Sequence, residues 1–244
     1  MNTLHASPLP LFSIDDHILT GDNITFRLSP NTSGRFQSGS PDTIVIHFTA
    51  GSSLSSSVNV LTNADSGVSA HFAVGRNGDI VQMLPTNKIA WHAGKSNWKK
   101  DKSVNKTSLG IEISNKGHQF GYKNFPKKQI KSIIKLSKYL IKKYKIKKSN
   151  ILGHSDISYD RKKDPGEKFP WQYLSKKKIG FWHNIDEKKL KRLRNKEISN
   201  SDKIRFFKFL FKIGYFKNIL RKNKKNLLTK SFQRRYRQKL INGK

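Results

Sequence analysis

The run from Thr43 to Phe48, TIVIHF, constrains the fold of this 244-residue chain more than any other stretch. It is almost continuously apolar and rich in β-branched residues, which is typical of a strand buried on both faces inside a sheet that helices cover. The run therefore predicts an α/β fold. His47 stands near the carboxyl end of this strand, where open α/β sheets place their sites. The alternative is a buried histidine satisfied by hydrogen bonds.

The segment GHSDISYDRKKDPG, residues 153–166, holds two candidate metal ligands and a lysine in one loop. His154 follows an apolar pair, and Asp164 precedes Pro165, which pushes the aspartate towards extended backbone. The glycine that follows permits a turn, so the carboxylate should sit on a fixed bend. With His47 as the third donor, the set predicts a His/His/Asp zinc site with its fourth position left for water, as in hydrolytic zinc proteins.

Residues 109–114, LGIEIS, predict a second strand whose alternation separates Glu112 from the apolar side chains. A carboxylate in mid-strand must be paired, solvated in a cleft or protonated, because burial without a partner costs several kcal/mol. A place in a cleft beside the metal explains it most simply. Trp91 and His92 lie in the short segment IAWHAG, which suits either the wall of such a cleft or the core.

Other stretches predict the frame around these residues. A hairpin is expected from residues 70–74 and 80–84, joined by the turn signal RNGD. Residues 126–144 predict a helix with one apolar stripe that covers the sheet. A strand over residues 150–154 would deliver His154, and a shorter helix would close the domain near Trp182. Residues 1–41, rich in Ser, Pro, Asn and Asp, predict an irregular arm packed on the domain.

The formal net charge of +33 comes from 49 Lys and Arg against 16 Asp and Glu. It indicates either polyanionic partners or a proteome biased towards lysine, and both readings stay open. Residues 183–202 read as a polar linker. Residues 203–244 carry two amphipathic helices, the first ending at Gly214. A small helical binding domain, a basic membrane-surface segment and a nucleic-acid arm compete for this region, and its aromatic stripes favour a packed domain.

The chain has no cysteine, which excludes disulfides and thiolate ligands. Its N-terminus lacks the basic opening and apolar run of a signal peptide, and no segment has the roughly 18 apolar residues of a membrane span. We expect a soluble monomer. It would be periplasmic if an export signal has been removed, and cytoplasmic otherwise.

Seven blocks together resemble one family, the zinc-dependent type 2 N-acetylmuramoyl-L-alanine amidases, which are related to peptidoglycan-recognition proteins. These blocks are IVIHFTAG, NADSGVSAHFAVGRNGDIVQMLP, AWHAG, SLGIEISNKG, NILGHSDI, RKKDPG and FPWQYL. The resemblance implies a zinc amidase domain over residues 42–182, with a central mixed β-sheet covered by helices. The tail segments FKIGYF and SFQRRYRQ look like two helices of a three-helix peptidoglycan-binding module. Residues 203–244 would then be an all-helical appendage that is either incomplete or docked on the catalytic domain.

The resemblance also implies a set of residue roles and a reaction. The reaction is hydrolysis of the amide between N-acetylmuramic acid, or its 1,6-anhydro form, and the L-alanine of the stem peptide, in cell-wall remodelling or recycling. Peptidoglycan or muropeptides would be the partners. His71 is expected to support the site without touching metal. The implied zinc ligands are His47, His154 and Asp164, the catalytic residues Glu112 and Lys162, and the substrate-groove residues Trp91 and His92.

Two rival functions remain. Relatives in the same superfamily that lose a zinc ligand only bind peptidoglycan, but all three ligand positions here carry competent side chains. A basic protein that binds anions or nucleic acid is the second rival. No nucleic-acid motif is visible, so we do not expect that partner. The basic C-terminal region could still make peripheral contact with an anionic surface while the enzyme works.

Overall fold

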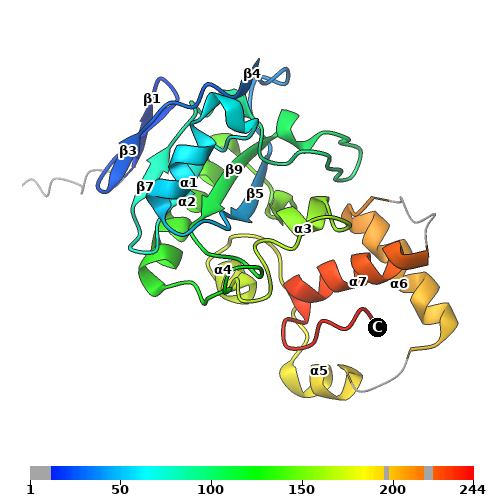
Figure 1. The fold of residues 1–244 in the computed structure, drawn as a ribbon. Coiled ribbons are helices and arrows are strands. Elements are labelled where there is room, and N and C mark those ends of the chain that lie inside the picture. The colour runs from blue at the N-terminus through cyan, green and yellow to red at the C-terminus, as the bar shows by residue number, and fades with distance from the viewer. Residues whose placement is uncertain (1–11, 195–197, 217–221) are drawn as a thin grey trace, which may run out of the picture.

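The computed structural model describes residues 12–194, 198–216 and 222–244. Its centre is a six-stranded sheet in the order β10-β5-β9-β6-β7-β3 (Figure 1). Strands β10, β5, β9 and β6 run parallel, β7 is antiparallel to β6, and β3 is parallel to β7. The predicted mixed sheet is therefore confirmed. Its strands are β3 (Ile24–Phe26), β5 (Thr43–Phe48), β6 (Phe72–Val74), β7 (Ile80–Gln82), β9 (Ser108–Ile113) and β10 (Ile151–Gly153).

Helices cover both faces of the sheet, as the apolar run of β5 predicts. Ile44 and Ile46 of β5 belong to the apolar cluster built around α2 (Lys127–Tyr144) and α4 (Trp171–Lys176). Val45, between them, belongs to a second cluster on the opposite face, with α3 (His154–Ile157), α6 (Asn200–Ile213) and α7 (Lys222–Tyr236). Helix α1 (Leu54–Leu61) packs in a third cluster with Ala73 of β6. His47 therefore points, like Val45, away from α2.

The predicted hairpin is present as β6 and β7, with Gly78 in the turn at a φ of 101°. The covering helix also matches, although Pro126 is its N-cap rather than its first helical residue. The strand that delivers His154 ends one residue earlier than predicted. His154 opens α3 instead.

The prediction for residues 1–41 is an irregular arm packed on the domain, and residues 1–11 lie outside the described residues. In the described part the packing is confirmed, because Phe12, Leu19 and Phe36 join the core, but the irregular structure is wrong. This part holds β1 (Ser13–Asp15), β2 (Ile18–Thr20), β3 and β4 (Thr32–Arg35), of which β3 is an edge strand of the main sheet and β4 pairs with β8 (Lys88–Ala90). Strands of three or four residues are too short for alternation to be read. Strands β3 and β4 form because they pair with strands distant in the sequence, β7 and β8.

The linker prediction for residues 183–202 also needs correction, because α5 (Glu187–Arg194) lies inside it. The Asp186 carboxylate accepts the Lys189 N–H at 2.9 Å, which caps the start of this helix. The linker reading weighed the polar composition and missed the capping signal. Helix α6 (Asn200–Ile213) likewise starts before the predicted boundary, at the cap Ser199.

Helices α6 and α7 (Lys222–Tyr236), together called the C-terminal helices, lie beside α3 at one side of the molecule (Figure 1). Leu210, Tyr215 and Leu228 share a buried apolar cluster with Leu152 and Ile157. The two helices are thus docked on the sheet-bearing part of the chain, which is how they bury their apolar stripes.

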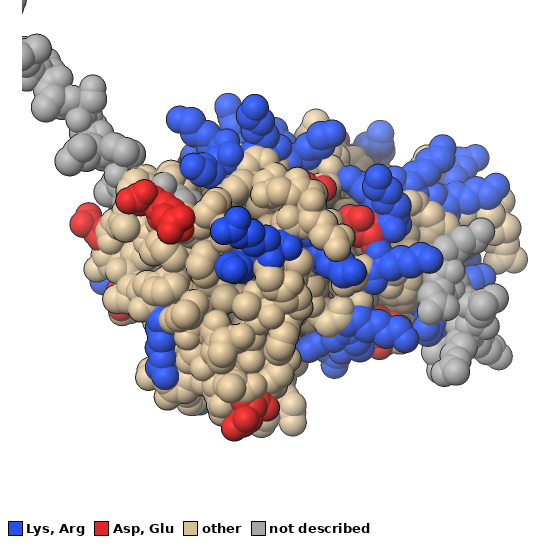
Figure 2. Space-filling model, turned by 90° about the horizontal axis from the view of Figure 1, so that it is seen from above, with Lys and Arg blue, Asp and Glu red and all other residues tan. Residues whose placement is uncertain are grey.

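Lys and Arg side chains are spread over the face seen in Figure 2 and are not gathered in one patch. The positive charge therefore singles out no one surface on that face for a polyanion. None of the helices in the described part of the chain combines the length and apolar character that a bilayer crossing requires.

Candidate metal centre

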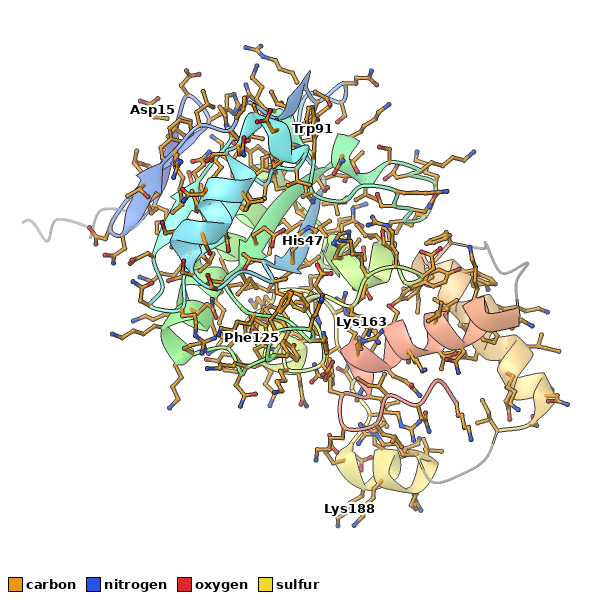
Figure 3. The ribbon with its side chains drawn as sticks, viewed as in Figure 1. Asp15, His47, Trp91, Phe125, Lys163 and Lys188 are labelled. Atoms are coloured by element: carbon orange, nitrogen blue, oxygen red, sulfur yellow. The ribbon has the colours of Figure 1, made fainter. Side chains whose placement is uncertain are left out.

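His47 and Glu112 come from neighbouring parallel strands and stand side by side. In the register of β5 and β9, His47 is the direct partner of Glu112. Leu109, Ile111 and Ile113 fill the α2 side of β9, so alternation turns Glu112 to the same face as His47. His47 lies at the end of β5 in Figure 3. The strand pairing alone therefore brings a nitrogen donor and a carboxylate to one edge of the sheet.

His154 and Asp164 reach the same place from β10 and the loop behind it. Strand β10 pairs with β5 so that Gly153 is opposite Ile46, and His154 follows directly. The Ser155 N–H donates to the Asp164 carbonyl oxygen at 2.9 Å, which closes the loop back on α3. A Cβ at Gly153 would lie 2.7 Å from Pro165 Cδ, so this close approach requires glycine.

The structure brings the three predicted ligands together. His47 Nδ1 and His154 Nδ1 lie 2.8 Å apart, and the Asp164 Oδ2 atom is 3.2 Å from the first and 3.0 Å from the second. All three side chains are buried. Ligand atoms about 2.0–2.2 Å from a tetrahedral zinc ion would be separated by roughly 3.3 Å, close to these spacings.

Hydrogen bonds around His47 determine which of its ring nitrogens carries the proton. The Ser108 hydroxyl donates to the Val104 carbonyl oxygen, so its oxygen must accept from His92 Nε2, 3.2 Å away. Neutral His92 then has its lone pair on Nδ1, and that atom accepts from His47 Nε2 at 3.0 Å. The Nδ1 atom of His47 is therefore left as a lone pair facing the site.

His154 is fixed in the same tautomer by a carbonyl group. Its Nε2 is 3.2 Å from the Ala93 oxygen, which can only accept, and 3.4 Å from Arg161 Nη2, which can only donate. Because Arg161 Nη2 already donates to the Ala93 and Lys95 oxygens at shorter distances, the Ala93 contact decides: Nε2 carries the proton and Nδ1 is a lone pair. Two lone pairs and a carboxylate oxygen then converge on one point. Acceptors without a shared donor repel each other in a buried site, and a divalent cation between them removes that cost. These residues fit a metal ion.

Burial and neighbouring charges set the protonation of the cluster. Burial, reinforced by the positive charge that His154 would carry, lowers the pKa of His47 to about 4. Burial alone would raise the pKa of Asp164, but the two histidines outweigh it and hold that pKa below its ordinary range. At neutral pH His47 is therefore a neutral imidazole and Asp164 a carboxylate, the forms in which they bind metal.

The cluster opens into a pocket of about 720 Å³, which Glu112, Lys162 and Trp91 also line. The Oε2 atom of Glu112 is buried without a hydrogen-bond partner. Burial, and next the Asp164 charge, raise the pKa of Glu112 to about 8. Lys162 lies near enough for its positive charge to oppose that rise. An unpartnered carboxylate facing a pocket is available for proton transfer.

The two residues predicted for the groove lie in different surroundings. Trp91 is half-buried on the pocket wall, and its Nε1 donates to Ser33 Oγ at 2.7 Å, which anchors it to β4 (Figure 3). His92 is 8% exposed, and both of its nitrogens are engaged inside the protein with His47 and Ser108. His92 nevertheless lines the same pocket as Trp91.

His71 is placed as a supporting residue, as the sequence predicts. Its Nε2 donates to the Lys88 oxygen at 2.8 Å, and its Nδ1 accepts from the Gly110 N–H at 3.0 Å. Burial lowers its pKa to about 4, so it is a neutral structural histidine.

Sequence reasoning missed Ser108 and Gly110, which contact the His92 ring and so position it against His47. A Cβ at Gly110 would lie 2.5 Å from His92 Cγ, so the bare glycine makes room for the ring. Glycine inside a strand signals close approach of another group, and that signal stood two residues before Glu112. Arg161 was also missed. It donates to the Ala93 and Lys95 oxygens and ties the His154 loop to the segment after His92.

Comparison with known proteins shows the family of this chain. A family model described as N-acetylmuramoyl-L-alanine amidase matches residues 37–167. The chain is 41% identical over 151 residues to N-acetylmuramoyl-L-alanine amidase AmiD of Escherichia coli, which covers 57% of this chain and 54% of that protein. It is 43% identical over 110 residues to 1,6-anhydro-N-acetylmuramyl-L-alanine amidase AmpD of Haemophilus influenzae, covering 44% of this chain and 58% of the relative. The chain thus matches little more than half the length of these curated relatives.

Solved structures extend the likeness over most of the chain. The complex of E. coli AmiD with anhydro-N-acetylmuramic acid-L-Ala-D-γ-Glu-L-Lys superimposes with a TM-score of 0.72 at 28% identity, covering 96% of this chain and 91% of that one. AmpDh3 from Pseudomonas aeruginosa, in complex with anhydromuramic pentapeptide, gives 0.73 at 27% identity, covering 84% and 86%.

Proposed function

Because this chain belongs to the N-acetylmuramoyl-L-alanine amidase family, we propose that it hydrolyses the amide bond between N-acetylmuramic acid and the L-alanine of a peptidoglycan stem peptide. The observation that carries the proposal is the convergence of three metal-donor atoms beside an unpartnered carboxylate in one pocket. Amide hydrolysis needs a nucleophile, a charge sink and a proton for the leaving amine. The donor set and the carboxylate can supply each of them.

We propose that His47, His154 and Asp164 hold a zinc ion. Zinc bound by two imidazoles and one carboxylate, with a further position free, polarises a carbonyl and lowers the pKa of bound water from 15.7 to about 7. The surrounding residues keep the Nδ1 lone pairs of His47 and His154 directed at one point. Ser108 and His92 do this for His47, and the Ala93 carbonyl does it for His154.

Glu112 is the proposed general base and acid. Its Oε2, free of other partners, accepts the proton of the attacking water and passes it to the nitrogen of the departing alanine. Burial raises the pKa of this carboxyl group to about 8 in the metal-free protein, and the charge of a bound zinc ion would lower it towards neutral pH, where the group could carry out both halves of that transfer. The Lys162 ammonium, on the same pocket wall, stabilises the negative charge that develops on the substrate's carbonyl oxygen.

Trp91 is proposed to bind substrate. Its indole is held in place by Ser33 and offers an apolar face to the sugar or to the lactyl group. The sugar is proposed to include the 1,6-anhydro form, since AmiD and AmpDh3 have been solved in complex with anhydromuramyl peptides.

Incubation with defined muropeptides tests the proposal. Two substrates, a muramyl tripeptide and its 1,6-anhydro counterpart, would be incubated with zinc-loaded protein and with chelator-treated protein. We expect mass spectrometry to find free tripeptide and free sugar only with zinc. Binding of both substrates without cleavage would instead identify a peptidoglycan-binding protein.

A further inference from the structure

The turn that carries His154 is held from outside by residues of the C-terminal helices. Helix α3 has four residues, all buried, and makes one turn directly after β10. So short a helix has little stability of its own. Its orientation, and with it the aim of His154 Nδ1, depends on what packs against it.

Asp156, two residues after His154, is the main contact. Its carboxylate is 1% exposed and accepts three donors. Oδ2 accepts the Gly153 N–H at 2.8 Å and the Arg235 guanidinium at 2.5 Å, and Oδ1 accepts the Tyr215 hydroxyl at 2.6 Å. Arg235 comes from α7 and Tyr215 from just after α6. Helix α7 and the segment that follows α6 therefore supply two of the three donors, and α7 supplies the only positive charge among them.

Arg235 makes two further contacts with the sheet-bearing part of the chain. Its second terminal nitrogen donates to the Ile151 oxygen at 2.9 Å, in β10 itself. The guanidinium lies 4.1 Å from the centre of the Trp171 ring, at the start of α4. One buried side chain thus joins α7 to both ends of the segment that leads from β10 into α3.

A second hydrogen bond ties α7 to the residue next to His154. The buried Ser231 hydroxyl donates to the Ser155 carbonyl oxygen at 2.6 Å. The N–H of the same Ser155 donates to the carbonyl oxygen of Asp164. A continuous set of polar contacts therefore runs from α7 through Ser155 to Asp164, and Ser155 is the residue bonded to His154.

We propose that the C-terminal helices brace the metal centre, with Arg235, Tyr215 and Ser231 as positioning residues that hold the α3 turn and thereby aim His154. The proposal deepens the proposed function and rests on its metal site. Removing a residue that holds a metal ligand in position commonly weakens metal affinity about 10- to 100-fold. None of these three residues lines the pocket, so they should act on the metal and on turnover and leave substrate binding unchanged.

The test compares Arg235→Met with Arg237→Met, which removes an equal charge from the same end of the chain. Arg237 donates to the oxygens of Arg194 and Lys244, within the C-terminal part, and does not reach α3. Zinc affinity is measured by competition with a chelating dye, at a temperature where each variant is folded by circular dichroism. We expect about tenfold or more loss of affinity for Arg235→Met and no loss for Arg237→Met. Turnover should fall with unchanged KM.

Arg235→Met leaves Asp156 buried without its charge partner and can prevent folding. If it does, the zinc affinity of Tyr215→Phe, which removes one hydroxyl and keeps the ring, is the deciding measurement. Weaker zinc binding by folded Tyr215→Phe supports the brace. Wild-type affinity in whichever of the two variants folds overturns it.

Hydrogen exchange separates failure of the brace from failure of the proposed function. In metal-free protein the Ser155 amide, bonded to Asp164, should exchange faster in Arg235→Met, or in Tyr215→Phe if that variant decides, than in Arg237→Met. Equal exchange contradicts the brace even if the wild type cleaves muropeptides. If the Ser155 amide exchanges faster in the deciding variant but the zinc-loaded wild type cleaves no muropeptide, the role of the C-terminal helices stands and the proposed amidase function is refuted.

Discussion

Glu112 is predicted to destabilise the metal-free protein at neutral pH, although catalysis needs it. The unfolded chain carries the ordinary carboxyl pKa of 4.5, whereas burial raises the folded pKa to about 8. Between these values the unfolded state has lost a proton that the folded state keeps. The free energy of unfolding therefore falls as pH rises through this window. At about pH 7, some 2.5 units above the lower value, the loss is about 3 kcal/mol.

Glu112→Gln removes the titration while keeping the shape of the protonated side chain. We expect metal-free Glu112→Gln to match the wild type near pH 4.5 and to be more stable by about 3 kcal/mol near pH 7. Urea unfolding of both proteins across this range, with chelator present, measures the difference. Subtracting one protein from the other cancels the other titrating groups. Turnover of the zinc-loaded variant should fall by about 10²–10⁴-fold.

Glu167→Gln is the matched control with the opposite sign. Burial would raise the pKa of Glu167, but the hydrogen bond from His118, a backbone hydrogen bond and the nearby positive charges together outweigh it and lower that pKa. Removing this carboxylate should therefore lower stability at neutral pH. If Glu112→Gln gained no stability between acid and neutral pH, Glu112 would not be the buried, unpartnered carboxylate on which the mechanism depends.

Three further changes probe other parts of the site. Lys162→Met should lower kcat by about 10²-fold with little change in KM, as expected for a group that acts on the developing oxyanion; a change in KM alone would assign it to binding. Gly110→Ala puts a Cβ against the His92 ring and should cost about 1–3 kcal/mol of unfolding free energy together with zinc affinity, measured by urea unfolding and dye competition. Trp91→Ala should raise KM for muropeptides and leave zinc affinity unchanged, and loss of zinc would contradict its place on the pocket wall.

The sheet and the ligand trio could be predicted because their residues carry local signals. The run TIVIHF indicates a strand buried on both faces, and the bend before Pro165 indicates a fixed carboxylate. The resemblance to a known family supplied the roles of Glu112 and Lys162. Strand register then explains why His47 and Glu112 meet, since parallel neighbours align their carboxyl ends.

The features that could not be predicted depend on partners far away in the sequence. Strand β3 exists because it pairs with β7, and three residues carry no readable period. The support of His47 by His92 and Ser108 needs the packing of β8 against β9. The contact of Arg235 with Asp156 joins residues 79 positions apart. The sequence assigned SFQRRYRQ to a helix of the C-terminal module, but nothing in it indicated that Arg235 contacts Asp156.

The central claim is a single metal ion held by His47, His154 and Asp164, and zinc-edge anomalous diffraction tests it most directly. Crystals grown with one equivalent of zinc should show one strong peak within bonding distance of both Nδ1 atoms and the Asp164 carboxylate. A peak at another group of side chains, or zinc bound through the Nε2 atom of either histidine, would contradict the account.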